Sequence, residues 1–334
     1  MKLINNTIIG TLLLTIFFLA TDTHATTNCS ANANDLVFGS INMGAAQNST
    51  ATVTVNCNTF GLSLLANARV RMCLNIGSGS AAGSTVNSRV MSNISLDQLN
   101  FQIYRDASRS QIWGNTDTED LDIDLQYAVP VLGGSGMVSA TLYGRVPAQT
   151  NLSADNYQNP FTGSHTRLDY RYAEALLSTP NWPTSCTSGG NGGGSITFPF
   201  TASANVPGTC VIDSVNNLNF GTMPGLISSH IDQTTSLSFT CTNTTPWKVS
   251  LDDGLHVNGT SRRMHNSTSN SYLQYDLYSN SARNQRWGST LDVDTVNNIG
   301  TGNSQSLTVY GRVPAIQAVP TGEYSDTVTV TITY

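Results

Sequence analysis

The chain has 334 residues, a formal net charge of −6 and only 11% charged residues. This length predicts about two domains, and the sparse, net acidic charge excludes the basic patch of a nucleic-acid-binding protein. The five histidines are dispersed and the six cysteines form no C-x-x-C pair, so neither a metal site nor a cofactor is expected.

The N-terminal segment combines a basic residue with a short apolar run. Lys2 precedes the apolar residues 8–20, and the tripeptide THA, which ends at Ala25, fits a signal-peptide cleavage site. This pattern predicts a signal peptide over residues 1–25, because the apolar run is shorter than the roughly 20 residues of a membrane-spanning helix. We therefore expect an exported chain that begins near Thr26 and forms disulfides.

A duplication organises the rest of the chain. The octapeptide TLYGRVPA at residues 141–148 returns as TVYGRVPA at residues 308–315. Further pairs follow in the same order, among them LVFGSINMG with LNFGTMPG, TVTVNC with SLSFTC, and RVMSN with RRMHN. The order predicts two homologous domains, residues 26–207 and 208–334, rather than a short-period repeat.

Short segments in both copies alternate apolar and polar residues. Examples are ATVTV, FQIY, LDIDL, VSATLYGRV and DTVTVTITY, which Gly, Asn, Ser and Pro clusters separate. Such alternation predicts β-strands, although residues 62–70 also allow a short helix. We expect an all-β protein with two immunoglobulin-like β-sandwich domains.

The duplication also orders the cysteines. One pair occupies matching places in each copy and the remaining two cysteines occur only in the first copy, which predicts the bridges Cys29–Cys57, Cys210–Cys241 and Cys73–Cys186. Six cysteines allow 15 connectivities, and the repeat selects this one.

The two copies differ at their C-terminal ends. The second copy ends in a strand with four apolar residues on one face, Val328, Val330, Ile332 and Tyr334. The first copy continues past its matching strand, through a Gly-rich segment, to the alternating segment ITFPFTASA. We expect this segment, about residues 195–205, to be the final strand of the first domain and to have no counterpart in the second.

A sandwich without an edge strand exposes core side chains and unpaired backbone groups. We therefore expect the second domain to accept a strand from another chain on the face that carries Val328, Val330, Ile332 and Tyr334. Cys29 follows closely on the predicted cleavage site, so little chain precedes the first domain that could be donated. The protein would then stand at the end of a series of subunits.

Both copies resemble the spore coat protein U domain. The paired YGRVPA motifs, the R-x-M-x-N segments and the C-terminal VTVTITY carry this resemblance, which covers almost the whole mature chain. The family supplies the pilins of archaic chaperone–usher pili in Gram-negative bacteria, and a two-domain member with an incomplete second domain resembles a pilus tip adhesin. The resemblance implies a periplasmic chaperone, an outer-membrane usher and an adjacent strand-donating pilin as partners, with export through the periplasm to the pilus tip. Membership of a spore coat is the weaker alternative.

Three turn-like sites carry apolar residues in the first domain only. They are FGLSLLA at residues 60–66, VPVLGGSGM at residues 129–137 and ALLSTPNWPTSC at residues 175–186. Exposed apolar patches mark interaction sites, so we expect these loops to attach the cell to an abiotic or host surface, as in biofilm formation. The alternative is that their side chains fold into the core of the domain. The candidate residues are Phe60, Leu62, Leu64, Leu65, Val129, Val131, Leu132, Met137, Leu176, Leu177 and Trp182.

No catalytic motif is complete. Asp120, Asp122 and Asp124 alternate with apolar residues, and Leu125 and Val131 stand where a calcium loop has Gly and Glu. We expect no enzyme. Two alternatives to attachment through apolar loops remain open, a sugar-specific pilus lectin with a polar cleft near Trp182 and a structural coat or pilus protein without a receptor.

Overall fold

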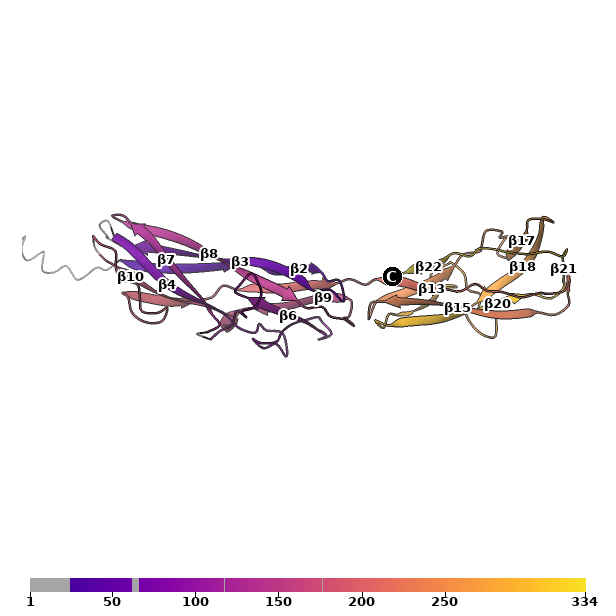
Figure 1. Ribbon diagram of the computed structural model, residues 1–334, viewed down its shortest axis with the longest axis horizontal. Helices are drawn as coiled ribbons and strands as arrows, with labels where there is room; N and C mark the ends of the chain where they lie inside the picture. Colours follow the sequence, from indigo (N-terminus) through magenta and orange to yellow (C-terminus); the bar gives the residue numbers. More distant parts are fainter. Residues whose placement is uncertain (1–24, 62–65, 117, 176) are drawn as a thin grey trace, which may run out of the picture. The chain divides into compact units, whose positions relative to one another are not determined.

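The computed structural model describes residues 25–61, 66–116, 118–175 and 177–334 (Figure 1). Residues 1–24 of the expected signal peptide lie outside this part. The chain divides into two compact units, one with the residues up to Gly39, Ala46–Pro147 and Tyr157–Ala204, the other with Ser40–Ala45, Ala148–Asn156 and Asn205–Tyr334. Domain 1 and domain 2 denote below the two copies of the repeat, residues 26–207 and 208–334.

Both domains are all-β. In the described residues the regular elements are strands, apart from one 3₁₀ turn at Gly163–His165, and no helix there is long and apolar enough to cross a membrane. The expected immunoglobulin-like β class is confirmed. Residues 66–70, for which the sequence also allows a helix, belong to a strand.

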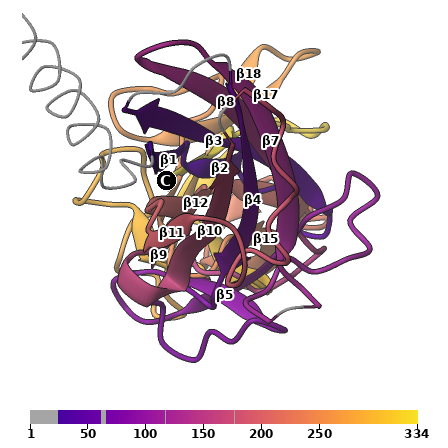
Figure 2. The same cartoon turned by 90° about the vertical axis from the view of Figure 1, so that its left-hand side faces the viewer.

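Domain 1 contains an eight-stranded and a four-stranded sheet. The larger sheet has the order β1 (Thr26–Ala33), β3 (Gln47–Phe60), β8 (Gly133–Val146), β6 (Gln98–Tyr104), β5 (Arg89–Ser92), β9 (Asp155–Phe161), β12 (Phe200–Val206) and β2 (Leu36–Ser40). The smaller sheet has the order β11 (Gly192–Ile196), β10 (Thr166–Glu174), β4 (Ala66–Ile76) and β7 (Leu121–Val129). The two sheets contact each other where β7 lies beside β8 (Figure 2) and where β1 meets β11.

Alternate side chains of these strands form the core. In β3, Val53, Val55 and Cys57 are at most 1% exposed, while the residues between them face outward. This is the period-two burial expected of a strand with one face on a core.

Domain 2 contains a five-stranded, a three-stranded and a two-stranded sheet. The five-stranded sheet has the order β13 (Cys210–Val215), β15 (Ile231–Cys241), β20 (Ser304–Val313), β18 (Ser271–Tyr278) and β17 (Arg262–Asn266). The others are β19 (Val296–Ile299), β16 (Pro246–Leu251) and β22 (Val330–Thr333), and the pair β14 (Leu226–Ile227) with β21 (Gln317–Ala318).

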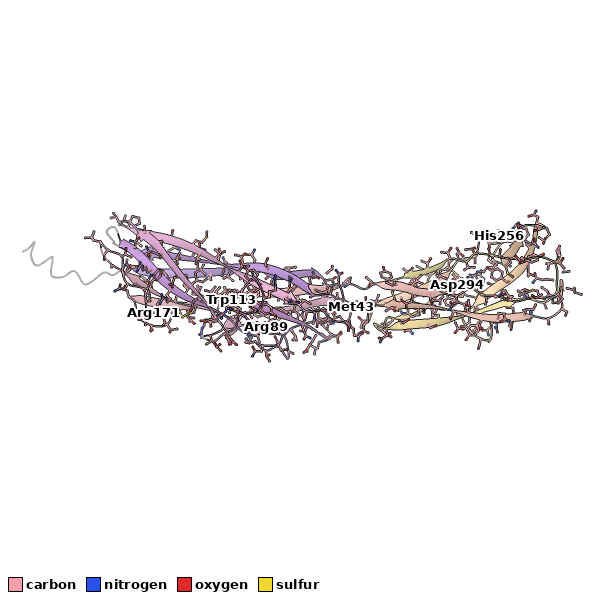
Figure 3. The ribbon with its side chains drawn as sticks, in the orientation of Figure 1. Met43, Arg89, Trp113, Arg171, His256 and Asp294 are labelled. Atoms are coloured by element: carbon pink, nitrogen blue, oxygen red, sulfur yellow. A yellow bond between two sulfur atoms is a disulfide. The ribbon has the colours of Figure 1, made fainter. Side chains whose placement is uncertain are left out.

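The repeated Arg and Trp residues have the same structural role in each domain. Arg89 is fully buried and donates hydrogen bonds to the carbonyls of Ile76 at 2.8 Å and Trp113 at 2.7 Å (Figure 3). In domain 2, Arg262 is fully buried and donates to the carbonyl of Trp287 at 2.8 Å. Burial lowers the pKa of Arg89 to about 9. These motif residues therefore brace the interior and are not exposed for binding.

Three disulfides, Cys29–Cys57, Cys73–Cys186 and Cys210–Cys241, join the pairs that the repeat predicts. Two of them link matching strands, β1 with β3 and β13 with β15. The other fastens the connection between β10 and β11 to β4. All six cysteines are therefore paired.

The two domains differ in how they end. In domain 1 the chain returns after β10 as β11, with Ile196 opposite Leu168, and then crosses to the other sheet, where β12 lies between β9 and β2. In domain 2, all of which is described, β22 pairs only with β16, and residues 216–225 and 319–329 form no strand. The single final strand expected at about residues 195–205 is thus two strands in domain 1, β11 and β12, which belong to different sheets, and domain 2 lacks counterparts of both as well as of β2 and β9.

Candidate binding surfaces

Three connections leave domain 1 at the same end of its strands. The β3–β8 pair ends with Phe60 opposite Gly133, and the β4–β7 pair ends with Ala66 opposite Val129. Strand β10 ends at Glu174, beside the start of β4. These three connections join β3 to β4, β7 to β8 and β10 to β11, and they are the ones expected to carry apolar residues. In the register of the sheets, the strand ends from which they start lie within a few residues of one another.

The turn between β7 and β8 presents two apolar side chains to solvent. Gly133 has φ +138°, and a Cβ there would lie 2.6 Å from the carbonyl oxygen of Thr59, so this close turn requires glycine. Val131 is 48% exposed and Leu132 is 80% exposed. Phe60, which is 62% exposed, lines the same shallow hollow as these two residues. We call Phe60, Val131 and Leu132 the apolar end.

Not every candidate residue belongs to this surface. Val129 is fully buried because it is the last residue of β7 and packs in the core, which corrects the expectation that it is a surface residue. Met137 is exposed but lies within β8, opposite Asn56, away from the turn. Leu177 is 65% exposed, just beyond β10. The remaining leucine candidates of these loops, Leu62, Leu64, Leu65 and Leu176, lie outside the described residues.

The connection from β10 to β11 lies along β4 instead of projecting from the end. Its anchors advance in step with the strand: Asn67 with Thr179, Arg69 with Pro180, Arg71 with Pro183, and Cys73 with Cys186. The Trp182 ring lies under the guanidinium of Arg69, 4.9 Å from ring centre to Cζ. Trp182 is therefore half-buried on the side of the sheet, which for this residue favours the alternative that the loop side chains pack onto their own domain.

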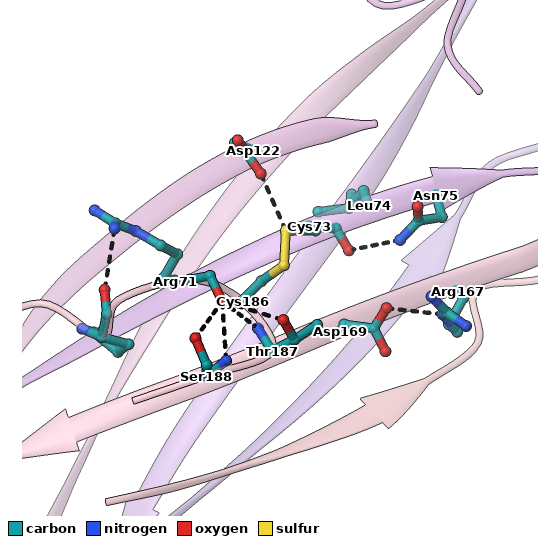
Figure 4. Close-up of a disulfide and its surroundings, with 12 residues drawn as sticks. Arg71, Cys73, Leu74, Asn75, Asp122, Arg167, Asp169, Cys186, Thr187 and Ser188 are labelled. Atoms are coloured by element: carbon teal, nitrogen blue, oxygen red, sulfur yellow. Dashed lines mark hydrogen bonds and ion pairs between the residues drawn. A yellow bond between two sulfur atoms is a disulfide. The ribbon is translucent and has the colours of Figure 1, made fainter. Parts of the chain in front are cut away.

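A polar cleft separates this connection from β7. Arg71 donates to Asp124 at 2.9 Å, and this hydrogen bond raises the pKa of the arginine. Asp122 lies 3.1 Å from the sulfur of Cys73, which is bonded to Cys186 (Figure 4). Among the described residues these last three form the one group with the spacing of a metal site, but both sulfurs are committed to the disulfide.

Domain 2 has a row of half-buried apolar residues where a strand covers the core of domain 1, and we call this uncovered row the groove. The half-buried residues around its core include the last strand and the segments on either side of the missing one, namely Leu218, Met223, Tyr324, Val328, Val330 and Ile332. Tyr334 is 61% exposed. In domain 1 the corresponding positions are covered by β12, whose Phe200 stacks on Phe161 with ring centres 4.5 Å apart. Of the four residues expected to form an acceptor face, Val328, Val330 and Ile332 belong to this row, and their role in accepting a strand stays a prediction.

Hydrogen bonds hold the segment ahead of β22, which contributes Tyr324 and Val328 to the groove. Asp326, whose side chain is 1% exposed, accepts hydrogen bonds from Tyr275 at 2.8 Å and from the backbone of Leu255 at 3.0 Å, and lies 3.1 Å from His256. Burial, together with the hydrogen bond to Asp326, raises the pKa of Tyr275. Ser325 exchanges two backbone hydrogen bonds with His265. The segment is thus held towards β17 and lacks a strand on the groove side.

Two parts of the chain match one sequence family. The profile of the Spore Coat Protein U domain matches residues 14–163 and 196–331. The chain belongs to the Spore Coat Protein U domain family. Protein U of Myxococcus xanthus is 39% identical over 145 residues, which are 39% of this chain and 80% of that protein.

Solved structures are similar to this chain at low sequence identity and with TM-scores below 0.5. The CsuC–CsuE chaperone–tip adhesion subunit complex of Acinetobacter baumannii has a TM-score of 0.47 and 20% identity, covering 92% of this chain and 100% of the other. The CupB6 tip adhesin of Pseudomonas aeruginosa has a TM-score of 0.32 and 10% identity, covering 92% and 94%.

The two Spore Coat Protein U matches begin at equivalent places. The second starts at residue 196, so it includes β12 ahead of Cys210, the first cysteine of domain 2. β12 therefore lies within the second family match by sequence and in a sheet of domain 1 by structure.

Proposed function

We propose that the chain is the tip adhesin of a chaperone–usher pilus and has no catalytic activity. One observation carries the proposal: domain 1 is closed by β12, which lies ahead of Cys210 in the chain, whereas domain 2 repeats the frame of domain 1 without a strand in that place. A subunit with such a groove needs a strand from a neighbour to bury its core. The donor would be the adjacent pilin, and the periplasmic chaperone would cover the groove before the usher exports the subunit to the cell surface.

The apolar end of domain 1 would make the attachment. Removing one large apolar side chain from water stabilises a contact by about 1.5–3 kcal/mol. The exposed Phe60, Val131 and Leu132 offer such a gain against an abiotic or host surface, and Leu62, Leu64 and Leu65 follow Phe60 in the sequence. A single contact of this kind is weak, but many pili on one cell act together through avidity.

Attachment is tested by removing apolar side chains that no core contact requires. Val131→Ser with Leu132→Ser should abolish binding of cells to polystyrene, while electron microscopy should show an unchanged number of pili. Ile94→Ser is the matched control, because Ile94 is 93% exposed on a turn between β5 and β6. If the double variant binds as well as the control on equal numbers of pili, the apolar end is not the attachment surface.

The polar cleft favours a second candidate, a sugar-specific pilus lectin. Carboxylates and hydroxyls from Asp122, Asp124, Ser185 and Thr187 line it and offer hydrogen-bonding partners for a sugar. Asp124→Asn should then reduce binding to a glycan array and leave binding to polystyrene intact. A chain unaffected by both sets of variants would be a structural pilus or coat protein.

A further inference from the structure

Domain 2 carries a small sheet at one end that the described residues of domain 1 lack. Strands β14 and β21 place Leu226 opposite Ala318 and Ile227 opposite Gln317. The Ile316 amide also donates to the Ile227 carbonyl at 2.7 Å. Ile227 is buried, so the other face of the sheet carries Leu226, Ala318 and, two residues before Ala318, Ile316. We call these three residues the end patch.

Two apolar residues of the end patch are largely exposed to solvent. Leu226 is 69% exposed and Ile316 is 92% exposed. Ile316 also has φ +65°, a left-handed backbone that is rare for a β-branched residue. Domain 1 has Gln149 at the matching place in its VPA motif, without a positive φ. The fold of the repeat therefore does not demand an exposed isoleucine there, and strain of this kind points to a function.

The two chain segments that form the end patch carry no acidic residue, lysine or arginine. Residues 222–230 and 313–320 contain no Asp, Glu, Lys or Arg, and His230 is their one histidine. The flanking charges, Asp232 and Arg312, pair with each other at 2.7 Å. An uncharged apolar surface of this kind fits an apolar protein surface better than a charged ligand.

The direction of β12 indicates what would lie next to the end patch. In domain 1 the Thr201 amide donates to Asp35, before β2, and the Ile41 amide, after β2, donates to the Asn205 carbonyl at 2.8 Å. β12 therefore runs parallel to β2 and leaves the sheet beside Ile41. A strand that entered domain 2 in this direction would leave beside residues 222–223, the last residues before the turn into β14.

We propose that the end patch is a second contact with the strand-donating pilin, packing against an apolar surface of its folded body directly after the donated strand. This inference rests on the proposed function, because it takes the groove to be filled by a neighbouring subunit. The strand would supply most of the affinity. The end patch would slow dissociation and fix how the pilin body meets domain 2.

The contact is tested first by cross-linking in assembled pili. Because all six cysteines are in disulfides, Ile316→Cys introduces a single free thiol that accepts a benzophenone maleimide. Irradiation should join this label to the adjacent pilin, within the residues that follow its donated strand. The matched control is Val293→Cys, at a residue that is 79% exposed outside the end patch, and it should give no such product. Labelling of a second copy of this chain, or no product at residue 316, would overturn the proposal.

A binding experiment separates this contact from the groove itself. Leu226→Ser with Ile316→Ser should leave the affinity for a synthetic peptide of the donated strand unchanged. The same variant should release the whole pilin, co-purified from pili, about tenfold faster than the native chain. If the native chain fails to bind the peptide, the proposed function fails. If peptide and pilin both bind the variant as they bind the native chain, only the end patch contact is refuted.

Discussion

In domain 1, Leu36 of β2 is fully buried, whereas its counterpart in domain 2, Leu218, is only half-buried. The two domains nevertheless share a buried arginine, a buried tryptophan and a disulfide between matching strands. The frame of the sandwich is therefore built by the repeated residues, and closure depends on one strand. What distinguishes the domains is the origin of that strand.

The strongest test of this difference between the domains is to attach a strand covalently to domain 2. A copy of residues 192–206, joined after Tyr334 by a flexible linker as long as residues 175–191, should fill the groove. Isolated domain 2 should unfold readily, and the fusion should gain at least about 3 kcal/mol because Ile196, Phe198 and Phe200 each leave water. Urea denaturation followed by tryptophan fluorescence measures this change.

The control for the fusion carries the same strand with Phe198→Ser and Phe200→Ser. It should be no more stable than isolated domain 2. If domain 2 melted cooperatively as a monomer without any added strand, the missing strand would not be needed for its stability.

The converse test removes a buried side chain of β12 from domain 1. Phe200→Ala removes a ring that is 4% exposed and stacked on Phe161, so domain 1 should lose about 3–5 kcal/mol. Val328→Ala, at the half-buried counterpart of Phe161 in domain 2, should cost much less because no strand packs on it. Differential scanning calorimetry of the full chain can follow both domains. Equal losses from the two variants would contradict the comparison.

Acid should act on the last strand of domain 2 through a residue that domain 1 lacks. Burial raises the pKa of Asp252, but hydrogen bonds from Thr329 and Gly254 and the charge of Arg262 outweigh it, so the pKa is lowered in the fold. The stabilisation is therefore complete above the unfolded pKa of about 4 and is lost as the pH falls through the lower folded value. Partial exposure limits the effect to about 1 kcal/mol.

Thermal melts of the strand-fused domain 2 between pH 2 and pH 5 measure this loss. Asp252→Asn should melt lower than the parent at pH 5 and lose less stability on acidification. Gly77 occupies the position in domain 1 that matches Asp252. The backbone carbonyl of Gly77 accepts a hydrogen bond from Arg89, as that of Asp252 does from Arg262. A parent and variant with identical pH profiles would show that Asp252 does not secure the last strand.

The sequence was sufficient for the features that the repeat encodes. Strand class, the three bridges and the missing last strand follow from alternation and from the alignment of the two copies. The sequence could not place Trp182, because its position depends on Arg69 and Arg71 from a strand more than a hundred residues earlier. It also missed the burial of Val129, because the apolar residues around a turn look alike until the register shows where the strand ends.

The path of β12 also has a mechanical consequence. The strand has β9 and β2 as its hydrogen-bonded neighbours, one on each side, and its last residue, Val206, leads directly into the linker at residues 207–209. Tension on that linker pulls along the axis of the strand, in shear. The hydrogen bonds on both sides then share the load instead of opening one at a time. A domain closed in this way resists a force applied through its own chain better than one whose last strand is peeled from an edge.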